Sequence, residues 1–462
     1  MNTPRQLSRA LLLAAALAAG SCPGLRAADD TDAEIRALRE QIRLLDQRLH
    51  QLEEQQQRKE QEAAAAARTA AKVSVTDKGF SLASPDGAHA VSIRGLVQFD
   101  ARQFFDDGTG AARNSFVLRR ARPIIEGTFA RIFSFQFVPE FGGTAAPSIL
   151  DANLGISVSP AVQFKFGKFK VPVGLELLAS DSWTFFNERS LVTNLVPNRD
   201  VGAQVGGALA GGRVTYAAGV FNGVADGGSS TNADVDNDRD VAARLFVLPF
   251  KGDAGSPLQG LGAGVAASSG RQKTAAALTS GYKTDGQQTF FRYRSAVVAD
   301  GQSWRISPQA EYRHGPFGAV GEYAISTVNV RPTAAGAKAE LRNRAWQLEA
   351  GYVLTGEDSS SAGVVPAHPF SWDTGTWGAW EIAARWASLR IDDRAFPLFA
   401  DPAANASEAT AFGFGVNWYL SRTVRATVDY YQTRFAVPVV PAAAPADRPD
   451  EQALITRVQV SF

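Results

Sequence analysis

Residues 161–202 read AVQFKFGKFKVPVGLELLASDSWTFFNERSLVTNLVPNRDVG, and this stretch decides the fold. It begins as a strand, because apolar residues alternate with polar ones from Val162 to Gly167. Successive side chains of a strand point to opposite faces, so one face is aromatic and the other is basic and polar. A soluble sheet on a core shows this pattern, and so does a barrel with lipid outside and water inside.

The alternation changes phase after Gly167, which predicts a β-bulge near that residue. Beyond it, the apolar face carries Phe169, Val171 and Val173, and the opposite face carries Lys168 and Lys170. From about residue 174 to 200 no alternation remains. We interpret that segment as a loop that folds into the lumen of a barrel and narrows a pore.

Three motifs lie in this stretch: K-F-K-x-P-x-G-x-E at 168–176, F-x-E-R at 186–189 and P-x-R-x-x-G at 197–202. Together they resemble the phosphate-selective porin O/P family, and the resemblance extends from about Gly79 to Phe462. The resemblance implies an antiparallel transmembrane β-barrel of about sixteen strands in the outer membrane. It also implies a trimer that passes anions, with phosphate or polyphosphate as the expected solute.

The overall composition excludes some function classes and leaves others open. The 462 residues contain 47 Lys and Arg against 46 Asp and Glu, so net charge indicates no partner and any selectivity depends on where charges lie. The one cysteine, Cys22, falls in the expected leader, which leaves the mature chain without thiol chemistry. No apolar run of helix-spanning length follows the leader, as expected for a barrel.

The N-terminus predicts a secretory signal peptide over residues 1–28. Arg5 and Arg9 precede the apolar run from Leu11 to Ala19, and small residues follow. We expect this leader to direct the chain out of the cytoplasm, and the family resemblance implies a Gram-negative bacterium.

Residues 29–62 predict a coiled-coil helix in the periplasm. Apolar residues step by three and four along one narrow seam, formed by Ile35, Leu38, Ile42, Leu45, Leu49 and Leu52. A seam of this width favours self-association over packing on a core. Ile at one seam position and Leu at the other favour dimers, whereas the family resemblance implies a trimer. Residues 63–78 are alanine-rich and are interpreted as a linker.

Residues 79–462 predict the all-β barrel, with both termini in the periplasm and short turns alternating with long loops. On the second strand we expect Val117 to face lipid, with Arg119 breaking the pattern on that side. Residues 288–298 are assigned to a loop. The residues expected to face lipid or a subunit interface are Phe133, Phe135, Phe137, Phe412, Phe414 and Trp418. Those expected to face the lumen are Gln136, Glu140, Gly413 and Asn417.

The C-terminal strand alternates and ends on Phe462. A final strand with a terminal aromatic residue resembles the signal read by the outer-membrane assembly machinery of bacteria. We therefore expect an outer-membrane location, with outer-membrane lipid around the wall.

Basic residues are the candidates for anion binding and selectivity. In or beside the constriction these are Lys165, Lys168, Lys170, Arg189 and Arg199, and on the first two strands Arg94, Arg102, Arg120 and Arg122. Arginine binds phosphate oxygens bidentately, and several weak sites in series let an anion enter and leave. In the alternative reading these charges pair with Glu126, Glu140, Glu176 and Glu188 to fill a polar lumen, and Arg189 pairs with Glu188.

Catalytic, metal and nucleic-acid functions find little support. None of the four histidines lies on a strand beside a nucleophile or acid, so no catalytic residues and no cofactor are assigned. Aspartates alternate from Asp234 to Asp240, but Arg239 and Leu245 stand where a calcium loop needs Gly and Glu. Basic residues are too sparse for a nucleic-acid surface.

The sequence therefore predicts a passive outer-membrane anion channel that is not an enzyme. Two alternatives remain. One is a general or organic-solute porin whose lumen charges balance. The other is a plugged structural barrel whose coil contacts the cell wall.

Overall fold

The chain divides after Ala70 into a helical unit and a β unit. The computed structural model describes residues 27–106, 112–143, 146–234, 236–274, 278, 281–439 and 448–462. Most of the expected signal peptide, including Cys22, lies outside the described residues.

The helical unit is α1, Ala27–Thr69. It continues past residue 62 through the alanine-rich segment interpreted as a linker, because alanine is the strongest helix former. The seam residues are exposed in the single chain, with exposed fractions from 45% at Ile35 to 63% at Leu45. Within the described residues, no helix is long and apolar enough to cross a membrane.

The β unit contains sixteen strands that close a barrel, as predicted, and a hairpin beside it. The barrel strands are β3 Ala90–Asp106, β4 Ser115–Phe129, β5 Phe133–Glu140, β6 Ser148–Ser159, β7 Val162–Lys170, β8 Arg199–Leu209, β9 Val214–Phe221, β10 Asp240–Val247, β11 Gly262–Thr274, β14 Val298–His314, β15 Phe317–Arg331, β16 Ala339–Val353, β17 Ala379–Arg390, β18 Glu408–Tyr419, β19 Val424–Ala436 and β20 Glu451–Ser461. The remaining elements are β1 Lys72–Thr76, β2 Gly79–Ala83, β12 Tyr282–Lys283, β13 Thr289–Phe291, α2 Leu175–Leu178, and the 3₁₀ helices η1 Leu191–Leu195, η2 Ala210–Gly212 and η3 Asp393–Ala395.

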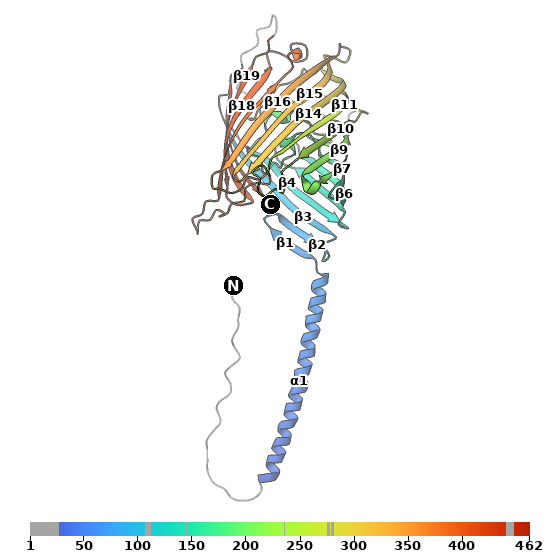
Figure 1. The fold of residues 1–462 in the computed structure, drawn as a ribbon, viewed down its shortest axis with the longest axis vertical. Coiled ribbons are helices and arrows are strands. Elements are labelled where there is room, and N and C mark those ends of the chain that lie inside the picture. Colours follow the sequence, from blue (N-terminus) through green and yellow to red (C-terminus); the bar gives the residue numbers. More distant parts are fainter. Residues whose placement is uncertain are drawn as a thin grey trace. The chain divides into compact units, whose positions relative to one another are not determined.

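Each barrel strand pairs antiparallel with its neighbours (Figure 1). The barrel closes where β20 pairs with β3, from Gln452 opposite Asp106 to Ser461 opposite Leu96. Phe462 and Gly95 then exchange two backbone hydrogen bonds, of 2.8 and 3.0 Å. We call the end that carries Phe462 and the short turns the turn end, and the opposite end the loop end.

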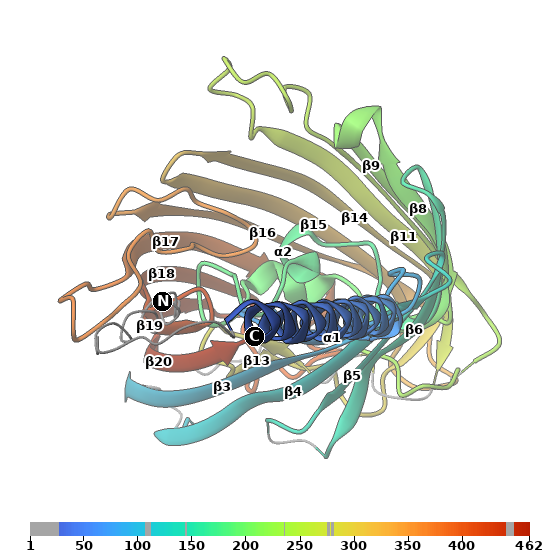
Figure 2. The same cartoon turned by 90° about the horizontal axis from the view of Figure 1, so that it is seen from below.

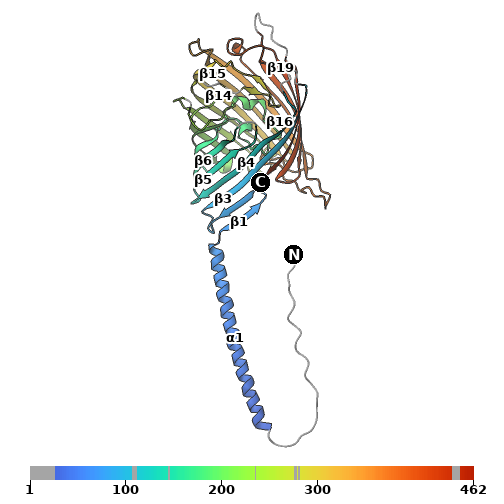
Figure 3. The same cartoon turned by 180° about the vertical axis from the view of Figure 1, so that it is seen from behind.

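The hairpin of β1 and β2 extends the sheet next to the start of β3, close to the C-terminus (Figure 3). Phe80 of β2 meets the Phe462 ring edge-on, with ring centres 6.4 Å apart. Residues 72–76, interpreted as part of the linker, thus form strand β1.

The two faces of the wall follow the predicted alternation on most strands. Phe133, Phe137, Phe412 and Phe414 are exposed on the outside, and Phe135 and Trp418 are half-exposed. On the inside, Asn417 is fully buried. Gln136 contacts Glu126 there, and Glu140 contacts Arg122. The predicted division of these residues between the outer and the inner face of the wall is confirmed.

The prediction for β4 is wrong near its start. Gln98 of β3 lies opposite Arg120, whereas the next residue, Phe99, lies opposite Leu118, so Arg119 is the extra residue of a β-bulge. The bulge turns Leu118, not Val117, outward, with 48% of its surface exposed. Arg119 points inward, where it becomes part of the site described below.

The bulge predicted near Gly167 is also wrong. β7 keeps one continuous register with β8 from Gln163 to Lys170. Gly167 instead adopts a φ of +114°, a conformation that favours glycine, and a Cβ there would lie 2.3 Å from the Ala152 carbonyl oxygen. Phe169 is only 4% exposed and lies on the Lys165 side, so the apolar residues after Gly167 face the interior.

Candidate functional site

The segment between β7 and β8, residues 171–198, folds into the barrel and is called the inserted loop. Seen along the barrel, α2 lies inside the ring of strands (Figure 2). The 3₁₀ helix of the same loop, η1, contacts β15, β16 and β17 on the far side of the lumen. The segment predicted as a lumen loop, at about 174–200, thus lies inside the barrel and reaches across to β15, β16 and β17.

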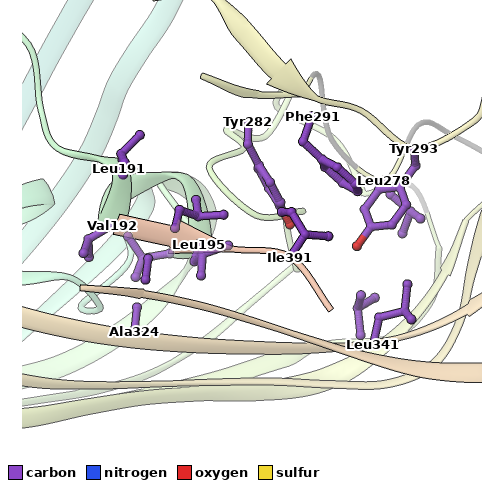
Figure 4. Packing of buried hydrophobic residues seen from close by; sticks show 14 of the residues in the cluster. Leu191, Val192, Leu195, Leu278, Tyr282, Phe291, Tyr293, Ala324, Leu341 and Ile391 are labelled. Carbon is purple, nitrogen blue, oxygen red and sulfur yellow. The ribbon is translucent and has the colours of Figure 1, made fainter. Parts of the chain in front are cut away.

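Apolar packing holds the inserted loop in place. Leu191, Val192 and Leu195 are fully buried and pack toward the wall at Ala324 (Figure 4). Small side chains on the lumen face of the wall leave room for these larger ones. Burying each such side chain stabilises the fold by about 1.5–3 kcal/mol.

A second loop, residues 281–297, folds onto the same cluster from the loop end. It contributes Tyr282, Phe290 and Phe291, all at most 1% exposed. The Tyr282 hydroxyl donates to Asp226 at 2.9 Å and accepts from Asn343 at 3.0 Å. The sequence predicted a loop at 288–298, but no pattern indicated that it enters the lumen.

Arginines of the wall bind the carboxylates of the inserted loop. Glu188 accepts from Arg119 at 2.6 and 2.9 Å and from Arg457 at 3.0 Å. Asp181 pairs with Arg120, Arg122 and Arg189. These contacts join the loop to β4 and β20.

The charges around these carboxylates decide their ionisation. Burial acts to raise the pKa of Asp181, but the positive charges led by Arg120 outweigh it and hold that pKa well below its usual range. Burial likewise acts to raise the pKa of Glu188, and Arg119 holds that pKa well below its usual range. Both groups therefore stay ionised in mildly acidic water.

Glu176 and Arg385 form a further contact between loop and wall. Glu176 accepts from the Ser190 backbone at 3.0 Å and from its hydroxyl at 2.6 Å, and it lies 3.5 Å from Arg385. Arg385 also pairs at 3.0 Å with Asp285 of the second loop. One buried guanidinium thus links both loops to β17.

Every arginine predicted as an anion site has a carboxylate partner. The pairs are Arg94 with Glu126, Arg102 with Asp100 and Glu188, Arg120 with Asp181, Arg122 with Glu140 and Asp181, Arg189 with Asp181, and Arg199 with Asp151. The suggested pair of Glu188 with Arg189 does not form, because Arg189 turns to Asp181. These pairs partly cancel the positive charge of the arginines.

The three predicted lysines form no ion pair within the described residues. Lys168 donates to the Ser230 carbonyl at 2.6 Å and to Asn232 at 2.8 Å. Lys170 donates to the Ala179 carbonyl at 2.8 Å. Lys165 lies with its ammonium 5.4 Å from the Phe169 ring centre. Their ammonium groups are therefore held by carbonyl, amide and aromatic contacts and not by carboxylates.

Two cavities border the inserted loop. The larger, about 420 Å³, lies toward the turn end of β4, and the smaller, about 220 Å³, lies toward its loop end. The larger is lined by the cations Arg122, Lys165, Lys170, Arg199 and Arg244 and by the carboxylates Asp151 and Asp181. The smaller is lined by the cations Arg119, Arg120, Arg189 and Lys283 and by the carboxylates Glu188 and Asp226. Basic residues thus outnumber acidic ones in both.

Six of the nine predicted residues line these cavities. Arg94, Arg102 and Lys168 are missing from the described lining of either one. The prediction did not include Arg119, Arg244 or Lys283. Arg119 is hidden by its bulge, and Lys283 stands in a loop without periodicity. Arg244 falls between apolar neighbours on a strand whose inward face was readable from alternation.

Comparison with known proteins agrees with this architecture. The profile of the family described as "Phosphate-selective porin O and P" matches residues 91–462. Porin O of Pseudomonas aeruginosa is 24% identical over 395 residues, which cover 78% of this chain and 86% of that protein.

Solved structures with the same fold include two outer-membrane proteins. The outer-membrane channel DcaP of Acinetobacter baumannii superposes with a TM-score of 0.52 at 10% identity, over 81% of this chain and 98% of its own. Outer-membrane expressed OmpT of Vibrio cholerae gives a TM-score of 0.52 at 12% identity, with the same coverage. At these identities the likeness concerns the fold alone.

Proposed function

The chain belongs to the family of phosphate-selective porins O and P, and from that premise we propose that this outer-membrane channel takes up anions, with phosphate and polyphosphate as candidate solutes. The channel is passive, and transport follows the gradient. Neither a cofactor nor a catalytic step enters the proposal.

One observation carries the anion preference. The chain as a whole has a net charge of +1, yet basic residues exceed acidic ones in both cavities along the inserted loop. Charges in a cleft with low-dielectric walls concentrate the field and raise the local concentration of counter-ions. Two unit charges 4 Å apart interact by about 4 kcal/mol at an effective dielectric near 20, so a few unpaired cations suffice.

Lys165 and Arg244 contribute most to this field in the larger cavity, because no described carboxylate pairs with them. Arg244 instead donates to the Gln309 side chain at 2.9 Å. In the smaller cavity Lys283 has the same role, since Glu188 and Asp181 bind the arginines around it. Lysine ammonium groups act on phosphate as point charges, and several weak sites in series let an anion enter and leave.

The test is the reversal potential of the purified full-length protein in a planar bilayer under a potassium chloride gradient. An anion channel gives a potential of the sign set by chloride. Added phosphate or polyphosphate then reduces the chloride current in proportion to its occupancy. A potential near zero with no block by phosphate supports the general porin instead, and the absence of conductance supports the plugged barrel.

We further propose the cellular arrangement. The signal peptide is removed, Phe462 serves outer-membrane assembly, and α1 extends the seam of Ile35 to Leu52 into the periplasm. Self-association of that seam and of the barrel wall gives a homotrimer, the state that the family resemblance implies. The exposed seam supports this assembly.

A further inference from the structure

A basic patch lies on the outer face of the wall at the loop end, away from the lumen. We call it the rim patch. It contains Arg342 and Arg344 of β16, Arg390 of β17, and Arg394 of η3. Together with three carboxylates, these side chains line a hollow of about 530 Å³.

Strand alternation shows that the rim patch faces outward. On β16 the residues Leu341, Asn343 and Ala345 are at most 1% exposed and point into the barrel. Arg342 and Arg344 stand between them and are exposed on the other face. The rim patch is therefore separated by the wall from the anion path proposed above.

Two of the arginines repel each other. Arg344 of β16 lies directly opposite Arg390 of β17 in the strand register. Directly opposed side chains of neighbouring strands have Cβ atoms about 5 Å apart, and like charges there destabilise the pair. An anion bound between them removes this repulsion.

The carboxylates nearby do not neutralise Arg344 and Arg390. Arg344 has no ion pair or hydrogen bond in the part of the chain that the structure describes. Arg390 pairs with Asp393 at 3.2 Å, but the two side chains are 62% and 71% exposed, so water screens the pair. Asp392 is already taken by Arg394, at 2.6 Å.

Tryptophans mark the level of the rim patch along the wall. Trp346 is the next outward residue after Arg344, and its ring meets that of Trp386 with centres 4.8 Å apart. Arg342 lies over the ring of Trp304, 5.6 Å from its centre. Tryptophan concentrates at the boundary between acyl chains and headgroups. The rim patch therefore stands at headgroup level on the loop end, which faces the cell exterior because short turns lie in the periplasm.

We propose that the rim patch binds the phosphate groups of a phosphorylated glycolipid in the outer leaflet. The guanidinium groups of Arg344 and Arg390 share one phosphate, which replaces their repulsion by charge-assisted hydrogen bonds. The acyl chains of that lipid run along the apolar wall below, past Trp346 and Trp386. The bound lipid, rather than free phosphate, is the ligand, because the site is continuous with the lipid-facing surface.

The experiment uses the full-length protein purified in detergent, with bound lipid counted by native mass spectrometry. The probes are lipid A with both phosphates and the same lipid with its phosphates removed. The test variant is Arg344→Gln with Arg390→Gln. Arg434→Gln is the matched control, because Arg434 is also an exposed arginine near the loop end but pairs with Asp450 at 3.6 Å.

Wild-type protein and the Arg434 variant should bind the phosphorylated lipid roughly ten-fold more tightly than the phosphate-free one. The double variant should lose this preference and keep wild-type conductance, since neither residue lines the lumen. An unchanged preference in the double variant would overturn the proposal. Displacement of the lipid by excess inorganic phosphate would also overturn it, because the rim patch would then bind free phosphate. A double variant that forms a smaller oligomer but binds lipid as before would overturn it too, because the rim patch would then contact a second copy of the chain.

Discussion

At the scale of single residues, the basic side chains of the lumen fall into two groups that sequence alone does not separate. The arginines predicted as anion sites are bound to carboxylates, whereas Lys165 and Arg244 have none among the described residues. Selectivity should therefore depend on the second group more than on the first.

Replacing Lys165 and Arg244 together by Gln should weaken anion preference. Each charge contributes on the order of 0.5–2 kcal/mol to a nearby ion, so the anion-to-cation permeability ratio should fall several-fold. The reversal potential in a salt gradient measures this permeability ratio. The matched control replaces Arg36 and Arg39 of α1 by Gln, which should change nothing. An unchanged ratio in the lumen variant would place the selectivity elsewhere.

Gly95 should be required for barrel closure. A Cβ at this position would lie 2.6 Å from the Phe462 ring, which packs where β20 meets β3. Gly95→Val should therefore destabilise the barrel by about 1–3 kcal/mol, visible as a lower midpoint of heat unfolding on gels. Gly321→Ala is the control, because its Cβ would meet no atom closer than 3.9 Å. Equal midpoints for the two variants would contradict this account.

The failures of prediction at this scale have a local cause. Alternation has a period of two, so one extra residue at a bulge reverses every later assignment. Arg119 is such a residue, and its neighbours gave no sign of which side it would take. Where the register is unbroken, as around Asn417, inward and outward residues were predicted correctly.

At the scale of elements, the inserted loop shows why the interior was harder to predict than the wall. Phe169 and Leu191 are as apolar as any lipid-facing residue, yet they pack in a core inside the barrel. Hydrophobicity marks contact with apolar surroundings and does not distinguish lipid from an internal core. The position of the inserted loop in the chain was predictable, because the alternation of apolar and polar residues stops there. That the second loop packs against the inserted loop was not predictable.

The second loop should make selectivity depend on pH. Burial raises the pKa of Asp285 to about 6 despite the opposing charge of Arg385. Asp285 therefore gains a proton as pH falls from 7.5 to 5, which removes one negative charge from beside Arg385 and Glu176. Chloride preference should increase across this window. The Asp285→Asn variant should show the higher chloride preference at both pH 7.5 and pH 5. A chloride preference of the wild-type protein that does not change between these pH values would contradict the role given to Asp285.

At the scale of the whole molecule, the barrel was predictable because many weak signals repeat. Each strand offers only a few alternating residues, but the same rhythm of short turns and long loops recurs from β3 to β20. The partners of the charged residues were not predictable. Asp100 and Arg457 are separated by most of the chain, and only the closed register brings them within 2.6 Å.

Deleting residues 32–69 should leave a folded channel with weaker assembly. The barrel has its own packing and pairing, and α1 forms a separate compact unit. Single-channel conductance per subunit should match wild type, while the oligomer should dissociate at a lower temperature on gels. A control with Arg36 and Arg39 changed to Gln keeps the seam and should assemble normally. Failure of the deleted form to insert would show that the helix acts in biogenesis.

The ion pairs of Glu188 also have a consequence for the order in which the barrel folds. Its partners come from the first strands of the barrel, through Arg102 and Arg119, and from the last, through Arg457. Glu188 can contact the arginines of both ends of the barrel only after β20 has paired with β3. The inserted loop therefore cannot form all of its ion pairs before the barrel has closed. The last ion pair of Glu188 therefore forms in the same step as the closure of the barrel, and before that step the inserted loop lacks its contact with β20.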